Sequence, residues 1–156
     1  MATWKFVGLD ELVAEYNRVL NGEKDYIGKA VGAGAGIVAD AVKTEIRGLP
    51  VNNQYNSGVI TSVQKKGLID GFGIARLQDD NGYLNVKLGF DGYNGQKTKK
   101  YPNGQPNSVI ARSVNSGSSF RKKNPFVDRA TRANKAKCEQ VMERTINDEI
   151  TKLIGG

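Results

Sequence analysis

The chain has 156 residues and a mass of 16.9 kDa, a length that suits a single domain over residues 1–156 with one core. Its 23 basic residues outnumber 16 acidic ones, and the net charge of +7 favours polyanionic neighbours such as nucleic acid or an acidic protein surface. The absence of histidine and the presence of one cysteine, Cys138, exclude an intramolecular disulfide and a folding zinc site.

No segment of the chain predicts a membrane span or an export signal. The longest small-apolar run, residues 30–39, is far shorter than the roughly 20 residues that cross a bilayer. Residues 1–8 lack the apolar stretch and cleavage site of a secretory signal. We therefore expect a protein made in the cytoplasm, without a membrane partner.

Two amphipathic helices are predicted in the first third of the chain. Apolar residues recur at helical spacing over residues 9–20 and again from about 23 to 47, where Gly48 and Pro50 end the pattern. Three glycines, at positions 32, 34 and 36, oppose helix formation inside the second helix. Close approach of a neighbouring backbone is our preferred explanation for them, and a kink is the alternative.

The middle of the chain predicts a β-hairpin. Residues 71–77 and 83–90 are typical of strands, and Asp79-Asp80-Asn81-Gly82 between them is a strong turn signal, because Asn-Gly readily takes positive φ values. Leu84, Val86 and Leu88 alternate with polar residues, so one face of the second strand should meet the helices. The short apolar segment 59–63 is compatible with either helix or strand.

A long, exposed and flexible cationic loop is predicted over residues 91–107. The segment is rich in glycine, proline and lysine and has almost no aliphatic residues, while Tyr93 and Tyr101 add aromatic rings. A short helix should follow from residue 108 to about 115.

The last quarter of the chain predicts a long, anchored helix. Asn124-Pro125-Phe126-Val127-Asp128-Arg129-Ala130 places a proline at the first helical turn and a large aromatic residue behind it, and Gly155-Gly156 ends the helix. Its predicted apolar stripe consists of Phe126, Ala130, Ala133, Lys137, Val141, Thr145, Ile146, Ile150 and Leu153. Together the elements predict an α+β fold, in which a small antiparallel β-sheet packs against two long α-helices with long exposed loops.

No catalytic, cofactor-binding or metal-ligating constellation is recognisable, so we expect a protein that is not an enzyme. The glycines at 32, 34 and 36 do not have the spacing of a dinucleotide-binding turn, and no strand precedes them. Asp79 and Asp80 suit a turn. Cys138 has no histidine to act as its base and fits a buried position on the last helix.

Three basic clusters, all in predicted loops or turns, are the candidate interaction residues, together with the start of the last helix. They serve either as contacts to one polyanion, DNA or an acidic protein ring, or as solvated charge that needs no partner. The candidates are Lys65 and Lys66; Lys97, Lys99 and Lys100 with Tyr101; Arg121, Lys122 and Lys123; and Pro125 and Phe126. Aromatic residues are too sparse among them to favour a groove that stacks single-stranded bases.

The order of these pieces resembles the tail-completion family of long-tailed bacteriophages (siphoviruses), also described as minor tail components of the neck. Three motifs carry the resemblance, which spans nearly the whole chain. They are Gly8-Leu9-Asp10-Glu11-Leu12; the Ala/Gly-rich helix over residues 30–47 ending at Leu49-Pro50; and Asn124-Pro125-Phe126-Val127-Asp128-Arg129-Ala130, which is similar to the Pro-Phe-Leu-x-x-Ala start of the family's last helix.

The resemblance implies a non-enzymatic virion protein of the neck, without a cofactor. It would complete the head-proximal end of the tail and promote head–tail joining. Copies would form a homo-oligomeric ring, with a hexamer favoured, beside head-closure and tail-terminator or tail-tube proteins and with DNA in the channel as a further contact. The alternative function is a stand-alone basic nucleic-acid-binding module that uses the same lysines.

Overall fold

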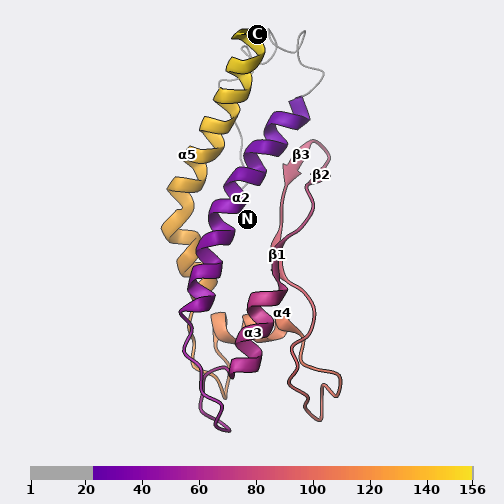
Figure 1. Ribbon diagram of the computed structural model, residues 1–156, viewed down its shortest axis with the longest axis vertical. Helices are drawn as coiled ribbons and strands as arrows, with labels where there is room; N and C mark the ends of the chain where they lie inside the picture. The colour runs from indigo at the N-terminus through magenta and orange to yellow at the C-terminus, as the bar shows by residue number, and fades with distance from the viewer. Residues whose placement is uncertain (1–22, 156) are drawn as a thin grey trace.

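The computed structural model describes residues 23–155 of the chain, and the helix predicted over residues 9–20 lies outside them. The described part contains four helices and two small antiparallel sheets, which confirms the α+β class (Figure 1). The elements are α2 (Glu23–Arg47), α3 (Ser62–Gly71), β1 (Phe72–Ile74), β2 (Gln78–Asp80), β3 (Tyr83–Asn85), β4 (Leu88–Phe90), α4 (Asn107–Ser116) and α5 (Phe126–Gly155).

Helices α2 and α5 pack side by side along the long axis of the molecule (Figure 1). The bounds of α2 agree with the prediction, and α5 begins at Phe126, directly after the proline. At 1.5 Å per residue its 30 residues span about 45 Å. The smaller elements pack against this pair of long helices, which we call the frame.

The predicted apolar stripe of α5 is wrong in its middle. Ala133 and Lys137 are exposed, whereas Cys138 and Met142 are buried. The buried apolar residues of α5 are Phe126, Ala130, Cys138, Met142 and Ile146. These residues are spaced at multiples of four, so they form a row that is inclined to the helix axis. Such a row is buried when the ridge of side chains on one helix packs into a groove of the other.

Close helix packing accounts for Gly34 but not for its two neighbouring glycines. A Cβ atom on Gly34 would lie 2.6 Å from Met142 Cγ and 2.9 Å from Cys138 Sγ of α5. At Gly32 and Gly36 no described atom apart from the neighbouring residues and the backbone of α2 itself comes within 4 Å of such a Cβ. Close packing therefore accounts for Gly34 alone, and there the approaching groups are side chains of α5 and not its backbone as predicted.

The segment left open between helix and strand contains the start of α3. Ile60 forms a parallel bridge with Val51, and Thr61 then caps the helix, which begins at Ser62. The Thr61 hydroxyl accepts from the backbone of Gln64, and the Gln64 side chain accepts from the backbone of Thr61, a reciprocal capping box. Lys65 and Lys66, predicted in a loop, consequently lie on a helix.

The predicted hairpin exists, but its strands are interrupted and form two ladders. Strand β1 pairs with β4, and β2 pairs with β3, both antiparallel. Three residues (75–77) separate the ladders on one side and two (86–87) on the other, so the first arm contains one extra residue, as in a β-bulge. Asp79 and Asp80 belong to β2, and the turn consists only of Asn81 and Gly82, whose φ values of 57° and 92° fit a type I′ turn.

The main core lies where α3, α4 and the β1–β4 ladder meet the C-terminal end of α2 and the N-terminal end of α5. Val42, Ile46, Leu68 and Phe126 are its largest fully buried side chains. Phe90 packs against the ring of Phe126 at 6.1 Å between centroids. Phe126 was among the candidate interaction residues; the structure assigns it to the core, because an aromatic ring behind the helix-starting proline is held there by its neighbours.

Candidate interaction site

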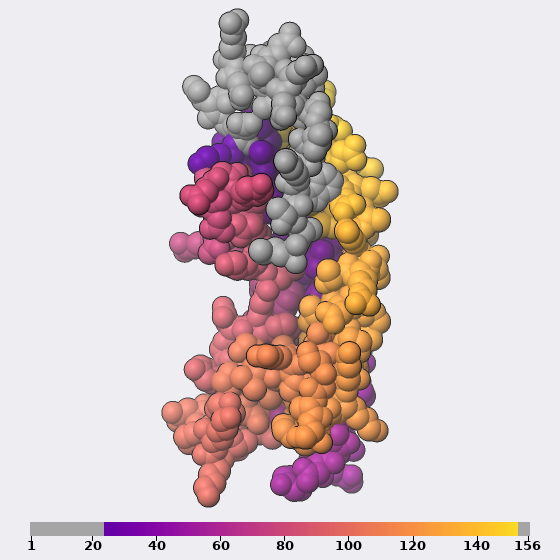
Figure 2. Space-filling model, turned by 180° about the vertical axis from the view of Figure 1, so that it is seen from behind, coloured from indigo at the N-terminus to yellow at the C-terminus, as the bar shows by residue number. Residues whose placement is uncertain are grey.

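Positive charge is concentrated at one end of the molecule, which we call the loop end and define as residues 43–71 and 91–129. This part contains twelve lysines and arginines and four acidic residues, a net charge of +8. The other described residues contain nine basic and nine acidic residues and are neutral. Segments of the loop end project separately from the body in the space-filling view (Figure 2), so their charges are accessible to a partner.

The first basic cluster is engaged within the protein. Lys65 Nζ donates to the backbone oxygens of Arg47 at 2.6 Å and Leu49 at 2.9 Å, and so satisfies carbonyl groups at the end of α2. Lys66 forms an ion pair with Asp70 one turn further along α3. Lys65 has a structural role, and Lys66 is exposed but partly neutralised.

The second basic cluster lies on the irregular loop between β4 and α4. Lys97, Lys99 and Lys100 are exposed, and no carboxylate of the described residues pairs with them. The Lys100 ammonium lies 5.4 Å from the centre of the Tyr101 ring, within range of a cation–π contact. Tyr101 and Thr98 exchange two backbone hydrogen bonds, which close the tip of the loop.

The third basic cluster lies between α4 and α5. Arg121 is half-buried, and its guanidinium donates to neutral side chains among the described residues, with Nη1 2.7 Å from Ser113 Oγ and Nη2 3.3 Å from Gln64 Oε1. Burial lowers the pKa of its guanidinium. Lys122 and Lys123 are exposed, so this cluster combines one anchored cation with two at the surface.

A buried glutamine that the sequence analysis did not single out joins the two basic loops. Gln64 is 3% exposed. Its Oε1 accepts from Arg121, and its Nε2 donates to Gln105 Oε1 at 2.7 Å. The capping-box spacing Thr-x-x-Gln could have placed Gln64 at a helix start, but its contacts to both loops depend on the tertiary fold.

Asn107, the first residue of α4, holds the start of the 91–106 loop and packs closely on α3. Asn107 is buried and its Nδ2 donates to the backbone oxygen of Asp91 at 2.8 Å. Gly67 and Gly71 permit this approach, because a Cβ atom at either position would overlap the Asn107 side chain. Two glycines one helical turn apart therefore provide the surface on which the loop rests.

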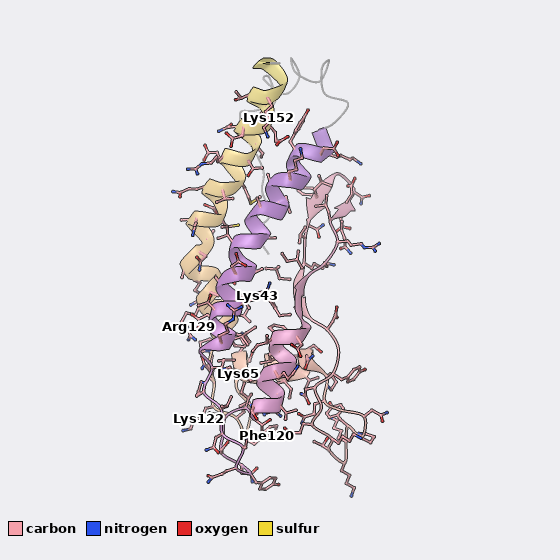
Figure 3. All side chains as sticks on the ribbon, in the orientation of Figure 1. Lys43, Lys65, Phe120, Lys122, Arg129 and Lys152 are labelled. Carbon is pink, nitrogen blue, oxygen red and sulfur yellow. The ribbon has the colours of Figure 1, made fainter. Side chains whose placement is uncertain are left out.

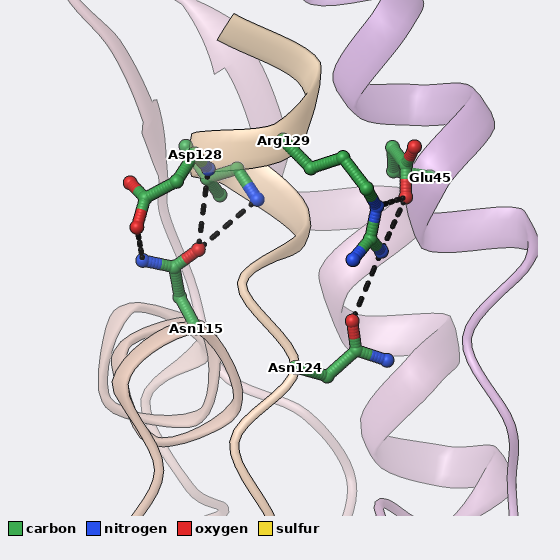
Figure 4. A network of polar contacts seen from close by, with 6 residues as sticks. Glu45, Asn115, Asn124, Asp128 and Arg129 are labelled. Atoms are coloured by element: carbon green, nitrogen blue, oxygen red, sulfur yellow. Dashed lines mark hydrogen bonds and ion pairs between the residues drawn. The ribbon is translucent and has the colours of Figure 1, made fainter. Parts of the chain in front are cut away.

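A network of polar contacts connects the loop end to both long helices (Figure 4). Arg129 of α5 donates to Glu45 Oε2 of α2 through Nε at 2.9 Å and Nη2 at 2.6 Å. The Glu45 carboxylate raises the pKa of Arg129. Nη2 also donates to Asn124 Oδ1 at 3.0 Å. The segment containing Pro125, itself half-buried, is thereby held against the frame.

Exposed aromatic rings accompany the charges at the loop end. The Tyr55 side chain is 93% exposed, and Phe120 is 65% exposed. Phe120 and Lys122 lie near the tip of this end in the side-chain view, while Lys152 marks the opposite end of α5 (Figure 3). The backbone N–H of Lys122 donates to Gly58 at 2.9 Å, so the loop that contains Tyr55 lies beside the third basic cluster.

A small pocket lies between α2 and α3 at the inner margin of the loop end. Its volume is about 240 Å³, and its lining contains Lys43, Ile46, Arg47 and Ile69. Apolar side chains from two helices thus lie beside two cations in one hollow. The site as a whole offers positive charge, hydrogen-bond donors and exposed apolar surface.

No protein-family model, curated protein or solved structure matches the chain. Within residues 23–155, no three or more histidine, cysteine, aspartate or glutamate side chains are grouped so that they could hold a metal ion. No helix in this part of the chain combines the length and apolarity needed to cross a membrane.

Proposed function

We propose that the chain is a structural virion protein of long-tailed bacteriophages and not an enzyme. In this proposal it belongs to the neck, completes the head-proximal end of the tail and promotes head–tail joining as part of a homo-oligomeric ring, with six copies favoured. Its neighbours would be head-closure and tail-terminator or tail-tube proteins. The order of the sequence motifs suggests this class of protein, and the distribution of charge supports the proposal.

The separation of a loop end of net charge +8 from the other described residues, which are neutral together, is the observation that carries the proposal. In a ring with cyclic symmetry every copy has the same orientation, so all loop ends gather on one face or around one rim. A surface of this kind attracts an acidic ring or DNA from the solvent. The lysines that remain available for it are Lys97, Lys99, Lys100, Lys122 and Lys123.

The proposed building block is a small β-sheet region packed on two long helices with long exposed loops. A closed ring satisfies the same heterologous contact in every copy. Tyr55 and Phe120, which are largely exposed in the single chain, are the kind of side chain that becomes buried at the centre of protein interfaces. Assembly would therefore stabilise loops that make few apolar contacts within one copy.

Native mass spectrometry and negative-stain microscopy of the purified protein test the ring directly. We expect one closed oligomer, with a hexamer as the main species. Lysates of cells infected with a phage that lacks the gene should contain filled heads and tails that are not joined. Normal infectious particles from that phage would refute the assignment.

The alternative is a stand-alone nucleic-acid-binding module. The observation in its favour is that the lysines of the 91–106 loop pair with no carboxylate of the described residues. It predicts a monomer whose affinity for duplex DNA falls steeply with salt. The logarithm of the binding constant should fall against the logarithm of the salt concentration with a slope of about −0.9 for each phosphate contact. Fluorescence anisotropy with a labelled duplex at several salt concentrations measures this slope. A monomer with a steep slope favours the module over the ring.

A further inference from the structure

The pocket between α2 and α3 contains positive charge that the fold itself does not need. Lys43 and Arg47 are exposed one helical turn apart at the end of α2, and no carboxylate of the described residues pairs with either. Cations near the C-terminal end of a helix interact favourably with the helix dipole. At α2, however, Lys65 already donates to the terminal carbonyl groups. The acidic neighbour Glu45 is occupied by Arg129.

The lining of the pocket specifies more than a negative charge. Ile69 is 42% exposed and offers apolar surface beside the two cations, whereas Ile46 is 0% exposed and lies behind the pocket in the core. A phosphate group would gain nothing from Ile69, whereas a carboxylate with an apolar or aromatic neighbour would match both the cations and Ile69. The fitting occupant is a protein segment with an acidic residue beside an aromatic one.

The tip of the hairpin has this chemistry on its outer face. Asp80 and Tyr83 are directly opposed in the β2–β3 ladder, so their side chains lie on the same face. Asp79 and Leu84 lie on the other face, where Asp79 forms an ion pair with Lys24 of α2 at 2.5 Å. Asp80 has no ion pair within the described chain, and Tyr83 is 54% exposed.

We infer that the outer face of the hairpin tip of one copy docks into the α2–α3 pocket of the next. Asp80 then pairs with Lys43 and Arg47, and the Tyr83 ring covers Ile69, with the guanidinium of Arg47 able to stack on it. Tip and pocket are different surfaces, so the contact is heterologous and either closes into a ring or continues as a filament. The inference rests on the proposed ring and names the contact that builds it.

Charge reversal tests the contact. Asp80→Lys, and separately Lys43→Glu with Arg47→Glu, place like charges together and should each weaken self-association about tenfold or more. A 1:1 mixture should assemble again, because the new lysine meets the new glutamates while the native tip of the second variant meets the native pocket of the first. Sedimentation velocity and native mass spectrometry distinguish monomers, rings and mixed rings.

A matched control for the pocket variant is Arg132→Glu with Lys135→Glu, which changes the net charge by the same amount at two exposed positions of α5; it should assemble as the wild type does. Rings formed by each pocket or tip variant alone would overturn the contact and leave the ring proposal intact. Complementary variants that join only into open chains would support the contact and refute the ring. A wild-type protein that stays monomeric at all concentrations overturns the contact, and imaging of virions then decides the function separately.

Discussion

Asn115 accepts a hydrogen bond from the backbone N–H of Val127, with 3.1 Å between Asn115 Oδ1 and the nitrogen. The same oxygen lies 3.4 Å from the nitrogen of Asp128, and Asn115 Nδ2 donates to the Asp128 carboxylate at 3.2 Å. The first turn of the 30-residue helix α5 is thus capped by a side chain of α4 (Figure 4). This contact connects the orientation of α4, and the basic loop after it, to the frame.

Replacing Asn115 with alanine should destabilise the protein by about 1 kcal/mol, the usual cost of a lost N-terminal cap. Urea unfolding followed by circular dichroism measures the change. Asn103→Ala removes an exposed asparagine from a loop and serves as the control, with little expected effect. Equal stability of the two variants would show that the remote cap is unimportant.

Gly34→Ala and Gly32→Ala should differ in stability by about 1–3 kcal/mol, with Gly34→Ala the less stable. Both changes improve intrinsic helix propensity by about 1 kcal/mol. Only the new methyl group at position 34 collides with Met142 and Cys138 of α5. Thermal unfolding of the two variants compares them directly, and the opposite order would contradict the packing of α2 on α5.

Gln64→Leu should loosen both basic loops at once. It leaves Arg121 without an acceptor on α3 and Gln105 without its donor, at a cost of about 1–3 kcal/mol for the unsatisfied groups. Trypsin should then cut faster after Lys97, Lys99 and Lys100 and also after Arg121. Gln78→Leu, at an exposed site on β2, is the control; faster cutting at only one loop would show that Gln64 does not couple them.

The ion pair between Lys24 and Asp79 should make stability depend on pH in the acidic range. The hydrogen bond from Lys24, followed by that from the backbone of Gly82, lowers the pKa of Asp79 in the folded protein. A lowered folded-state pKa stabilises the protein fully above the ordinary aspartate pKa of about 3.9, and this stabilisation is lost as the pH falls through the folded value.

Asp79→Asn should therefore be less stable than the wild type at neutral pH, and the difference should shrink once the pH falls below about 4. Unfolding midpoints between neutral and strongly acidic pH follow this convergence. Asp40→Asn removes an exposed carboxylate without an ion pair in the described chain and should show no such pattern. A difference for Asp79→Asn that is constant with pH would exclude the ion pair as its cause.

Several elements could be predicted because their signals are local. The extent of α2 follows from helical periodicity and from Gly48 and Pro50 beyond its end. Pro125 defines the start of α5. The turn at Asn81-Gly82 follows from the tolerance of these two residues for positive φ. In each case the residues that carry the signal lie within the element or within a few residues of it in the sequence.

The start of α3 has an equally local signal, which is the capping pair Thr61 and Gln64. That pair predicts a helix containing Lys65 and Lys66, whereas the apolar segment 59–63 by itself is compatible with helix or strand. The misplaced stripe of α5 has a different origin. Periodicity along one helix does not specify the angle at which a partner crosses it, and the crossing with α2 selects Cys138 and Met142 in place of Ala133 and Lys137.

The sequence alone determines the excess of positive charge and the clustering of lysines between residues 97 and 123. That Lys65 is used inside the fold, that Arg121 is anchored by a buried glutamine and that Lys43 and Arg47 border an apolar pocket follow only from the folded chain. Each of these facts depends on which distant segments meet, and that is set by the packing of apolar surfaces across the whole molecule. Charge can be counted residue by residue, but its partners and its exposure are properties of the folded arrangement.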